Sequence, residues 1–200
     1  MSDRTTEREW IHLAMQGDDD AFACLVEAYQ TPVYNLCYRM LGDGPEAEDA
    51  AQEAFLKAYR GLGSYDTRRS FTTWLLSIAS HHCIDRLRKR RLLTLSLEEL
   101  LPSQEKPDAK PGPEAMVANA EMQDSVRGML QQLGHKDRAA IVLRYWYEMS
   151  YEEISETLSL SVSAVKSRLH RARREVAKQW MEHEASVFAT RGRHDEASAL

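Results

Sequence analysis

Four prolines near the middle of the chain constrain its fold more than any other feature. They stand at positions 102, 107, 111 and 113 in the segment LEELLPSQEKPDAKPGPEA, residues 97–115. Proline lacks a backbone N–H and disfavours helix in the residue before it, so we expect no regular element to run through this segment. The sequence therefore predicts a flexible linker over 94–114. It separates a front domain, 19–93, from a back domain, 115–178, with extensions at 1–18 and 179–200.

On both sides of the linker, apolar residues recur at helical spacing and no alternating strand pattern is found. In the front domain, GDG and Pro45 separate the first predicted helix from the second, whose acidic start and basic end suit a helix dipole. A third front-domain helix is predicted over 71–91. We therefore expect an all-α fold of two small helical domains.

Composition excludes several classes of protein. No apolar run is long enough to cross a bilayer, and the charged, amphipathic N-terminus is unlike a secretory signal. The three cysteines, Cys24, Cys37 and Cys83, match no zinc spacing and are expected to be buried as small hydrophobic residues. These features predict a cytoplasmic protein without membrane insertion, metal or other cofactor.

The charge of the chain is unevenly distributed. Its net charge is −5, yet residues 67–93 hold seven basic side chains and one acidic, and residues 161–178 hold six and one. Salt screens charge effects beyond about 10 Å, so local fields rather than net charge govern docking. Two basic islands in an acidic chain indicate two surfaces for a polyanion.

The second island follows a helix-turn-helix pattern. Ser150 and Glu153 have the spacing of a capping box, Ser161 is suited to cap the next helix, and only LSLS lies between the two helices. Projected at about 100° per residue, the second helix buries one stripe: Val162, Val165, Leu169, Ala172 and Val176. Its opposite face carries Ser163, Ser167, His170, Arg171 and Arg174, with Lys166 and Arg173 on one flank and Arg168 on the other.

Such a face suits a DNA major groove, because cations donate to guanine edges and phosphates while short hydroxyls approach the backbone closely. A solvated basic helix paired with acidic neighbours is the alternative. The capped helix and tight turn before it favour the groove.

These residues also resemble a known family. SYEEISETLSLSVSAVKSRLHRARREV resembles the region 4 helix-turn-helix of bacterial sigma factors of the sigma-70 family, in particular the extracytoplasmic-function (ECF) group. AEDAAQEAFLKAYRGLGSYDTRRSFTTWLLSIASHHCIDRLRKRR is similar to region 2 of that group, so the resemblance spans about residues 19–178. It implies a sigma factor, which catalyses no reaction but binds core RNA polymerase and recognises the −35 and −10 promoter elements. An anti-sigma protein is a further partner implied by the resemblance.

The resemblance also implies roles for particular residues. It places Lys166, Ser167, His170 and Arg171 at −35 bases, Arg144 at the backbone or a base, and Arg168, Arg173 and Arg174 at phosphates. For the melted −10 element it implies Tyr65, Arg68, Arg69, Phe71, Trp74 and His81, with phosphate contacts from Arg86, Arg88, Lys89, Arg90 and Arg91. It assigns Asp49, Gln52, Glu53, Phe55 and Lys57 to core polymerase.

Simpler interpretations stay open beside these roles. Trp74 shares a helix face with Phe71, Leu75 and Ile78, which favours a core position. A stand-alone helix-turn-helix regulator accounts for the back domain but not the front one. A metal-dependent nuclease built on HHCID is disfavoured, because adjacent histidines on a helix point about 100° apart.

Overall fold

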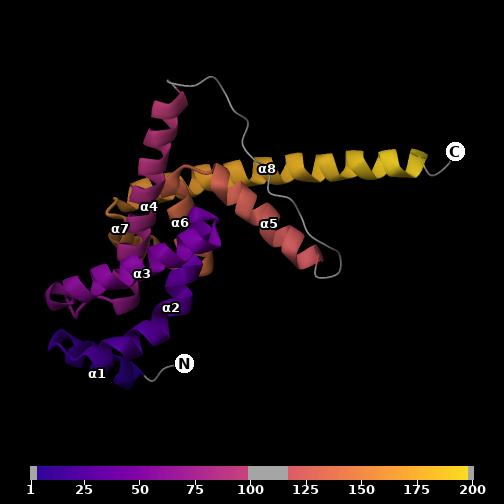
Figure 1. Ribbon diagram of the computed structural model, residues 1–200. Helices are drawn as coiled ribbons and strands as arrows, with labels where there is room; N and C mark the ends of the chain where they lie inside the picture. Colours follow the sequence, from indigo (N-terminus) through magenta and orange to yellow (C-terminus); the bar gives the residue numbers. More distant parts are fainter. Residues whose placement is uncertain (1–3, 99–116, 198–200) are drawn as a thin grey trace.

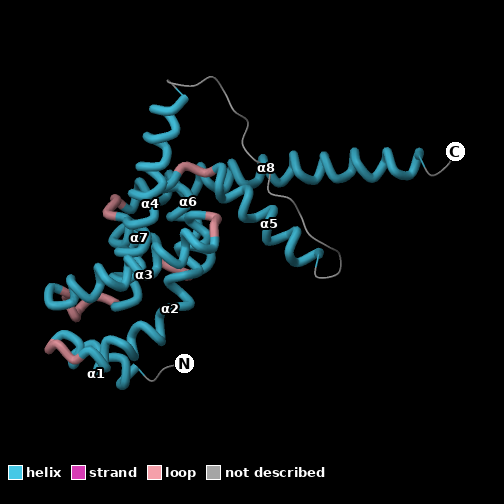
Figure 2. The backbone as a smooth tube through the Cα atoms, viewed as in Figure 1, coloured by secondary structure: helices cyan, strands magenta, loops and turns pink. Residues whose placement is uncertain are grey.

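Helices form all the regular structure in the residues that the structure describes, 4–98 and 117–197. The structure is a computed structural model, and Figure 2 shows helices joined by short loops. The elements are α1 (Arg4–Met15), α2 (Asp19–Leu41), α3 (Gly44–Gly61), a 3-10 turn at Leu62–Ser64, α4 (Phe71–Glu98), α5 (Val117–Gln132), α6 (His135–Trp146), α7 (Tyr151–Leu158) and α8 (Val162–Ala197). The all-α prediction is confirmed for this part of the chain.

Local signals set the boundary between α2 and α3. Gly42 ends α2 in the left-handed conformation, with φ of 82°, and its N–H donates to the Tyr38 carbonyl. Asp43 then caps α3 by accepting from the Glu46 N–H at 2.8 Å. Pro45 occupies the first turn, where its missing N–H costs nothing. The predicted break thus lies where the sequence indicates it.

The front domain packs α2, α3 and α4 around one apolar core (Figure 1). The alanine face of α3 lets it approach its neighbours closely, and Leu36, Met40 and Leu75 fill the space between helices. Cys37 and Cys83 are fully buried in this core, whereas Cys24 is half-buried. The prediction of buried cysteines is therefore confirmed for two of the three.

The segment before residue 19 contains a helix that packs against this bundle. Ile11 and Ala14 of α1 are buried, and α1 lies against α2. The Tyr29 hydroxyl donates to Glu7 Oε1 at 2.6 Å and lies 3.0 Å from Thr72 Oγ1. Burial and then the bond to Glu7 raise the pKa of Tyr29 to about 12. This hydrogen-bonded group joins α1 to both α2 and α4.

The helix-turn-helix predicted in the back domain is present. Ser150 and Glu153 form the reciprocal capping box, and these bonds hold the pKa of Glu153 below its usual value. Ser159 makes the tight turn in a left-handed conformation, and Ser161 caps α8 by accepting from the Ala164 N–H at 3.2 Å. The helix α8 then continues past residue 178 as far as Ala197.

The two domains pack against each other: α6 and α7 contact α4, and α5 and α6 contact α2. Arg138 is buried at this interface and donates to the carbonyls of Met40 and Gln131. The Tyr147 hydroxyl donates to the Pro32 carbonyl at 2.6 Å. The predicted linker begins inside α4, which runs to Glu98, and residues 99–116 lie outside the described part of the chain.

Candidate nucleic-acid and polymerase interfaces

The outward face of α8 is exposed, as the projection predicts. Val165, Leu169 and Ala172 are buried against α6 and α7, while Val162 and Val176 are half-buried. The exposed side chains on the other side of α8 are Ser163, Lys166, Ser167, His170, Arg171, Arg173 and Arg174, and Arg168 is half-buried. Hydroxyl, imidazole and cationic groups therefore share one accessible helical surface.

An acidic residue that sequence reasoning missed anchors two of these cations. Asp137, in the first turn of α6, accepts from Arg168 at 2.7 Å and from Arg171 at 2.6 and 3.0 Å. Burial raises the pKa of Asp137, but the bonds from Arg171 and Arg168 outweigh it, and the net shift is downward. Asp137 thus fixes one edge of the basic face, although 31 or more residues separate it from its partners.

Arg144 is half-buried beneath the start of α7. Its guanidinium donates to the Met149 carbonyl at 2.7 Å and lies over the Tyr151 ring, 5.4 Å from the centroid. Lys166 approaches the same ring, at 5.9 Å. Tyr151 therefore brings together two of the cations predicted for the −35 site.

Aromatic side chains predicted for the −10 site form a packed cluster. Tyr65 and Phe71 are buried, and Trp74 is half-buried. The Tyr65 ring lies 4.9 Å from Trp74 and 5.6 Å from Phe71, centroid to centroid. Trp74 therefore packs with the core while retaining an exposed part. The Tyr65 hydroxyl donates to the Arg69 carbonyl at 2.5 Å, which holds the loop 65–70 in place.

The same loop carries two arginines with different partners. Arg68 pairs with Asp66 at 2.7 Å, and that pairing lowers the pKa of Asp66 to about 2. Arg69 reaches Glu156 of α7 at 3.3 Å. Beside them, the loop, the start of α4 and one side of α1 enclose a pocket of about 680 Å³.

The basic half of α4 mixes paired and unpaired cations. Arg86 lies 3.7 Å from Asp49, and Arg90 lies 3.6 Å from Glu46. The other predicted phosphate contacts, Arg88, Lys89 and Arg91, are exposed. Among the side chains that the structure describes, no carboxylate lies within ion-pair distance of these three. They are the cations of α4 best able to meet phosphate.

The two histidines of α4 engage different partners. His81 contacts the Ser77 carbonyl at 2.8 Å, and His82 Nδ1 lies 2.8 Å from Lys57 Nζ. Burial first, and then Lys57, lower the pKa of His82. Within 4–98 and 117–197, no cluster of three metal-ligating side chains is found.

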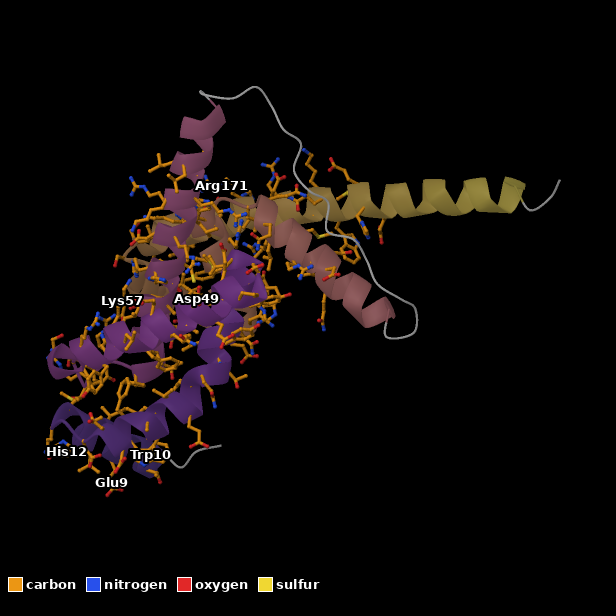
Figure 3. All side chains as sticks on the ribbon, viewed as in Figure 1. Glu9, Trp10, His12, Asp49, Lys57 and Arg171 are labelled. Atoms are coloured by element: carbon orange, nitrogen blue, oxygen red, sulfur yellow. The ribbon has the colours of Figure 1, made fainter. Side chains whose placement is uncertain are left out.

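The predicted polymerase-binding residues lie on one exposed stretch of α3. Asp49, Gln52, Glu53 and Lys57 are exposed, and Phe55 is half-buried. Figure 3 shows Asp49 and Lys57 along this helix, and Arg171 toward the opposite end of the molecule from α1. Leu56 and Tyr59 are also exposed here, at 47% and 45%. This mixture of carboxylates and exposed apolar side chains suits a protein partner better than DNA.

An apolar groove on the back domain was not predicted from the sequence. It encloses about 520 Å³ between α5, α6 and α8. Tyr145 and Met181 at its rim are 54% and 65% exposed, and Trp146 stacks beneath Arg39 at 5.1 Å. The apolar spacing of Val176, Trp180 and Met181 on α8 was the signal available in the sequence.

Comparison with known proteins finds a family match in each of the two domains. Residues 25–92 match sigma-70 region 2, and residues 123–176 match sigma-70 region 4. The fold and its two modules thus define a promoter-recognition subunit of bacterial RNA polymerase. The chain belongs to the sigma-70 family, in its ECF group, and it is a sigma factor for transcription initiation.

Two characterised relatives cover most of the chain. It is 41% identical over 170 residues to the ECF sigma factor SigW of Bacillus subtilis, covering 82% of this chain and 91% of SigW. It is 33% identical over 178 residues to the sigma-H factor of Pseudomonas aeruginosa, covering 86% of this chain and 92% of the sigma-H factor. The match to region 2 disfavours the stand-alone regulator, which left the front domain unexplained.

Solved structures show the same fold. CnrH, solved in complex with the cytosolic domain of CnrY, aligns with a TM-score of 0.64 at 25% identity, over 88% of this chain and 98% of that one. The sigma factor RpoE of Bartonella quintana, solved with the anti-sigma factor NepR, aligns with a TM-score of 0.63 at 21% identity. The alignment covers 80% of this chain and 96% of that one. In the described residues of this chain, no helix is both long and apolar enough to span a membrane.

Proposed function

We propose that the outward face of α8 reads the −35 element of the promoters that this sigma factor serves. The exposure of Ser163, Ser167 and His170 beside several cations, on the second helix of a capped helix-turn-helix, carries this proposal. In this proposal Lys166, Ser167, His170 and Arg171 contact base edges, and Arg144 contacts the DNA backbone or a base. Arg168, Arg173 and Arg174 are placed for phosphates.

The test uses core polymerase and genomic fragments with purified sigma factor, followed by sequencing of the transcripts. We expect their 5′ ends to share a −35 and −10 pair at fixed spacing, and absence of such a pair refutes the assignment. His170→Ala and Ser167→Ala should each change the −35 preference while binding to core polymerase is kept. Lys178→Ala is the control, since Lys178 pairs with Glu182 farther along α8. Equal loss of both activities in the His170 and Ser167 variants indicates a structural role.

We further propose that loop 65–70 and α4 bind the melted −10 element. The basic side chains of this part, Arg68, Arg69, Arg86, Arg88, Lys89, Arg90 and Arg91, supply charge for a single strand. Tyr65 and Phe71 line the pocket, Trp74 packs against both of their rings, and His81 lies on the exposed side of α4. A positively charged groove with aromatic side chains is the usual form of a single-strand site.

The exposed part of α3 is proposed to bind core polymerase. Asp49, Gln52, Glu53, Phe55 and Lys57 share it with the exposed Leu56 and Tyr59. Glu53→Lys should weaken binding to core polymerase without affecting thermal stability, because Glu53 is exposed. Glu27→Lys is a charge-matched control, because Glu27 is an exposed glutamate of α2 outside that stretch. Equal binding by the two variants argues against this surface.

An anti-sigma factor is proposed as a second protein partner, with the apolar groove of the back domain as its contact. An exposed apolar groove between helices suits an amphipathic helix. Met181→Glu places a charge at its exposed rim and should abolish retention of the anti-sigma factor, while Met122→Glu, outside the groove lining, should not. We further propose that the protein is a regulator rather than an enzyme and that it acts in the cytoplasm, where promoter DNA lies.

A further inference from the structure

The first helix, α1, forms one side of the pocket beside the predicted −10 residues. The pocket lining comes from three elements: Glu7, Arg8, Ile11 and His12 of α1, residues 65 and 67–70 of the loop, and Phe71 and Thr72 of α4. Its volume of about 680 Å³ lies in the range of sites that enclose a molecule larger than a single base. Without α1 this pocket is an open surface.

The α1 side of the pocket is held in place rather than resting loosely. Ile11 is buried, so the helix is rotationally fixed, and Glu7 accepts from the Tyr29 hydroxyl. Tyr29 in turn contacts Thr72, at the pocket edge of α4, and its ring lies 5.4 Å from that of Phe71. The pocket therefore has a defined shape, and the position of α1 is coupled to the aromatic floor.

The charges of α1 are divided between this structural contact and the open pocket. Glu7 is engaged with Tyr29, whereas Arg8 and His12 are exposed one turn apart on the pocket side, and His12 Nε2 lies 2.9 Å from Gln16 Nε2. Across the pocket lie Arg68 and Arg69, each already paired with a carboxylate. Among the described side chains, none pairs with Arg8. Arg8 is therefore the lining cation most available to a ligand.

We propose that α1 is part of the DNA-binding site, and that Arg8 and His12 contact a nucleotide of single-stranded promoter DNA held in this pocket. The base lies against the aromatic floor, and its phosphate meets the two side chains of α1. A cation opposite an aromatic surface is the combination that single-strand sites use. The inference rests on the proposed −10 function of loop 65–70 and adds a helix to it.

The test measures binding of the full chain to a 12-nucleotide single strand carrying the −10 sequence found by transcript mapping, by fluorescence anisotropy across salt concentrations. Arg8→Ala should weaken binding about tenfold and reduce the slope of log K against log salt by about 0.7. His12→Ala should weaken it less. Arg60→Ala is the matched control, because Arg60 is an exposed arginine of the same domain outside the pocket lining.

A second measurement locates the effect at the pocket. The same strand is synthesised with an abasic site at each position in turn, and one position should weaken wild-type binding most. At that position Arg8→Ala and the missing base should not have additive effects, because both disrupt one bound nucleotide. Additive effects at every position overturn the inference, as does equal binding by Arg8→Ala and Arg60→Ala.

Failure of the wider proposal has a different signature. If wild-type protein shows no preference for the −10 strand over a scrambled strand, the assignment of loop 65–70 fails together with that of α1. If the preference is present and the two arginine variants behave alike, only the role of α1 is refuted. Point substitutions are used because deleting α1 would expose the core that Ile11 and Ala14 cover.

Discussion

Replacing Asp137 with asparagine should show how much the Asp137 carboxylate contributes by holding Arg168 and Arg171 in place on α8. In the structure the carboxylate accepts three hydrogen bonds, one from Arg168 and two from Arg171, and its side chain is only 11% exposed. Asparagine keeps the shape but loses the charge. The Arg168 pair alone, with Arg168 28% exposed, is worth about 2 kcal/mol as a charge-assisted bond. In a chain of this size that corresponds to a fall in Tm of about 4–8 °C.

The matched control is Asp124→Asn. Asp124 pairs with Arg127 at 2.9 Å, but its side chain is 63% exposed, so its loss should cost about 0–1 kcal/mol. Thermal unfolding followed by circular dichroism compares the two variants with wild type. Equal changes in Tm contradict the reasoning, because they mean that Asp137 behaves as an ordinary surface carboxylate.

The stability difference at Asp137 should also depend on pH. Its pKa is lower in the folded protein than the usual 3.8, so the charged form stabilises the fold. This contribution is fully present above about pH 4 and is lost as pH falls through the lowered pKa. Wild type and Asp137→Asn should therefore converge only in that acid range. A gap that closes near neutral pH refutes the assignment to Asp137.

DNA binding is the second property of Asp137→Asn to be measured. Removing a negative charge beside the basic face should strengthen binding to unrelated duplex at low salt. Releasing Arg171 should at the same time reduce the preference for the −35 duplex by about tenfold, the value of one well-placed base contact. A fall in both affinities would indicate that α8 itself was disrupted.

Three further predictions follow from other contacts. Tyr147→Phe removes the bond to the Pro32 carbonyl and should lower the free energy of unfolding by about 1 kcal/mol in urea titration; no change refutes it. A thiol reagent should modify Cys24 alone in native protein and all three thiols in urea; fast native reaction of the buried pair, Cys37 and Cys83, contradicts the fold. Arg88→Ala should reduce the salt slope of single-strand binding by about 0.7, and Arg86→Ala by less, since Arg86 lies near Asp49; the reverse order refutes the ranking.

The features predicted correctly from the sequence are those in which cause and effect lie within a few residues. The capping box of Ser150 and Glu153, the cap at Ser161 and the helix break at GDG all depend on neighbours three or four positions away. The exposed face of α8 follows from the same short period, because burying Leu169 fixes where His170 points.

The features that the sequence did not reveal depend on distant partners. Asp137 meets Arg171 only because α6 packs against α8, and Glu7 meets Tyr29 only because α1 packs against α2. Nothing in the local pattern around Asp137 distinguishes it from the other carboxylates of the chain. For α1 a signal was available, since Ile11, Ala14 and Met15 have helical spacing, and their burial or half-burial follows from it.

The positions of the carboxylates explain how a chain with a net negative charge can present basic surfaces. Several of them pair with the basic islands themselves: Asp66 with Arg68, Glu156 with Arg69, and Asp137 with Arg168 and Arg171. These pairs fix the directions of arginines in each island. Other cations of the islands, such as Lys89 and Arg174, are exposed, and the described side chains place no carboxylate within ion-pair distance of them. Arginines held in fixed directions beside unneutralised cations attract a polyanion while limiting the orientations in which it binds, and that is what the proposed selective binding of promoter DNA requires.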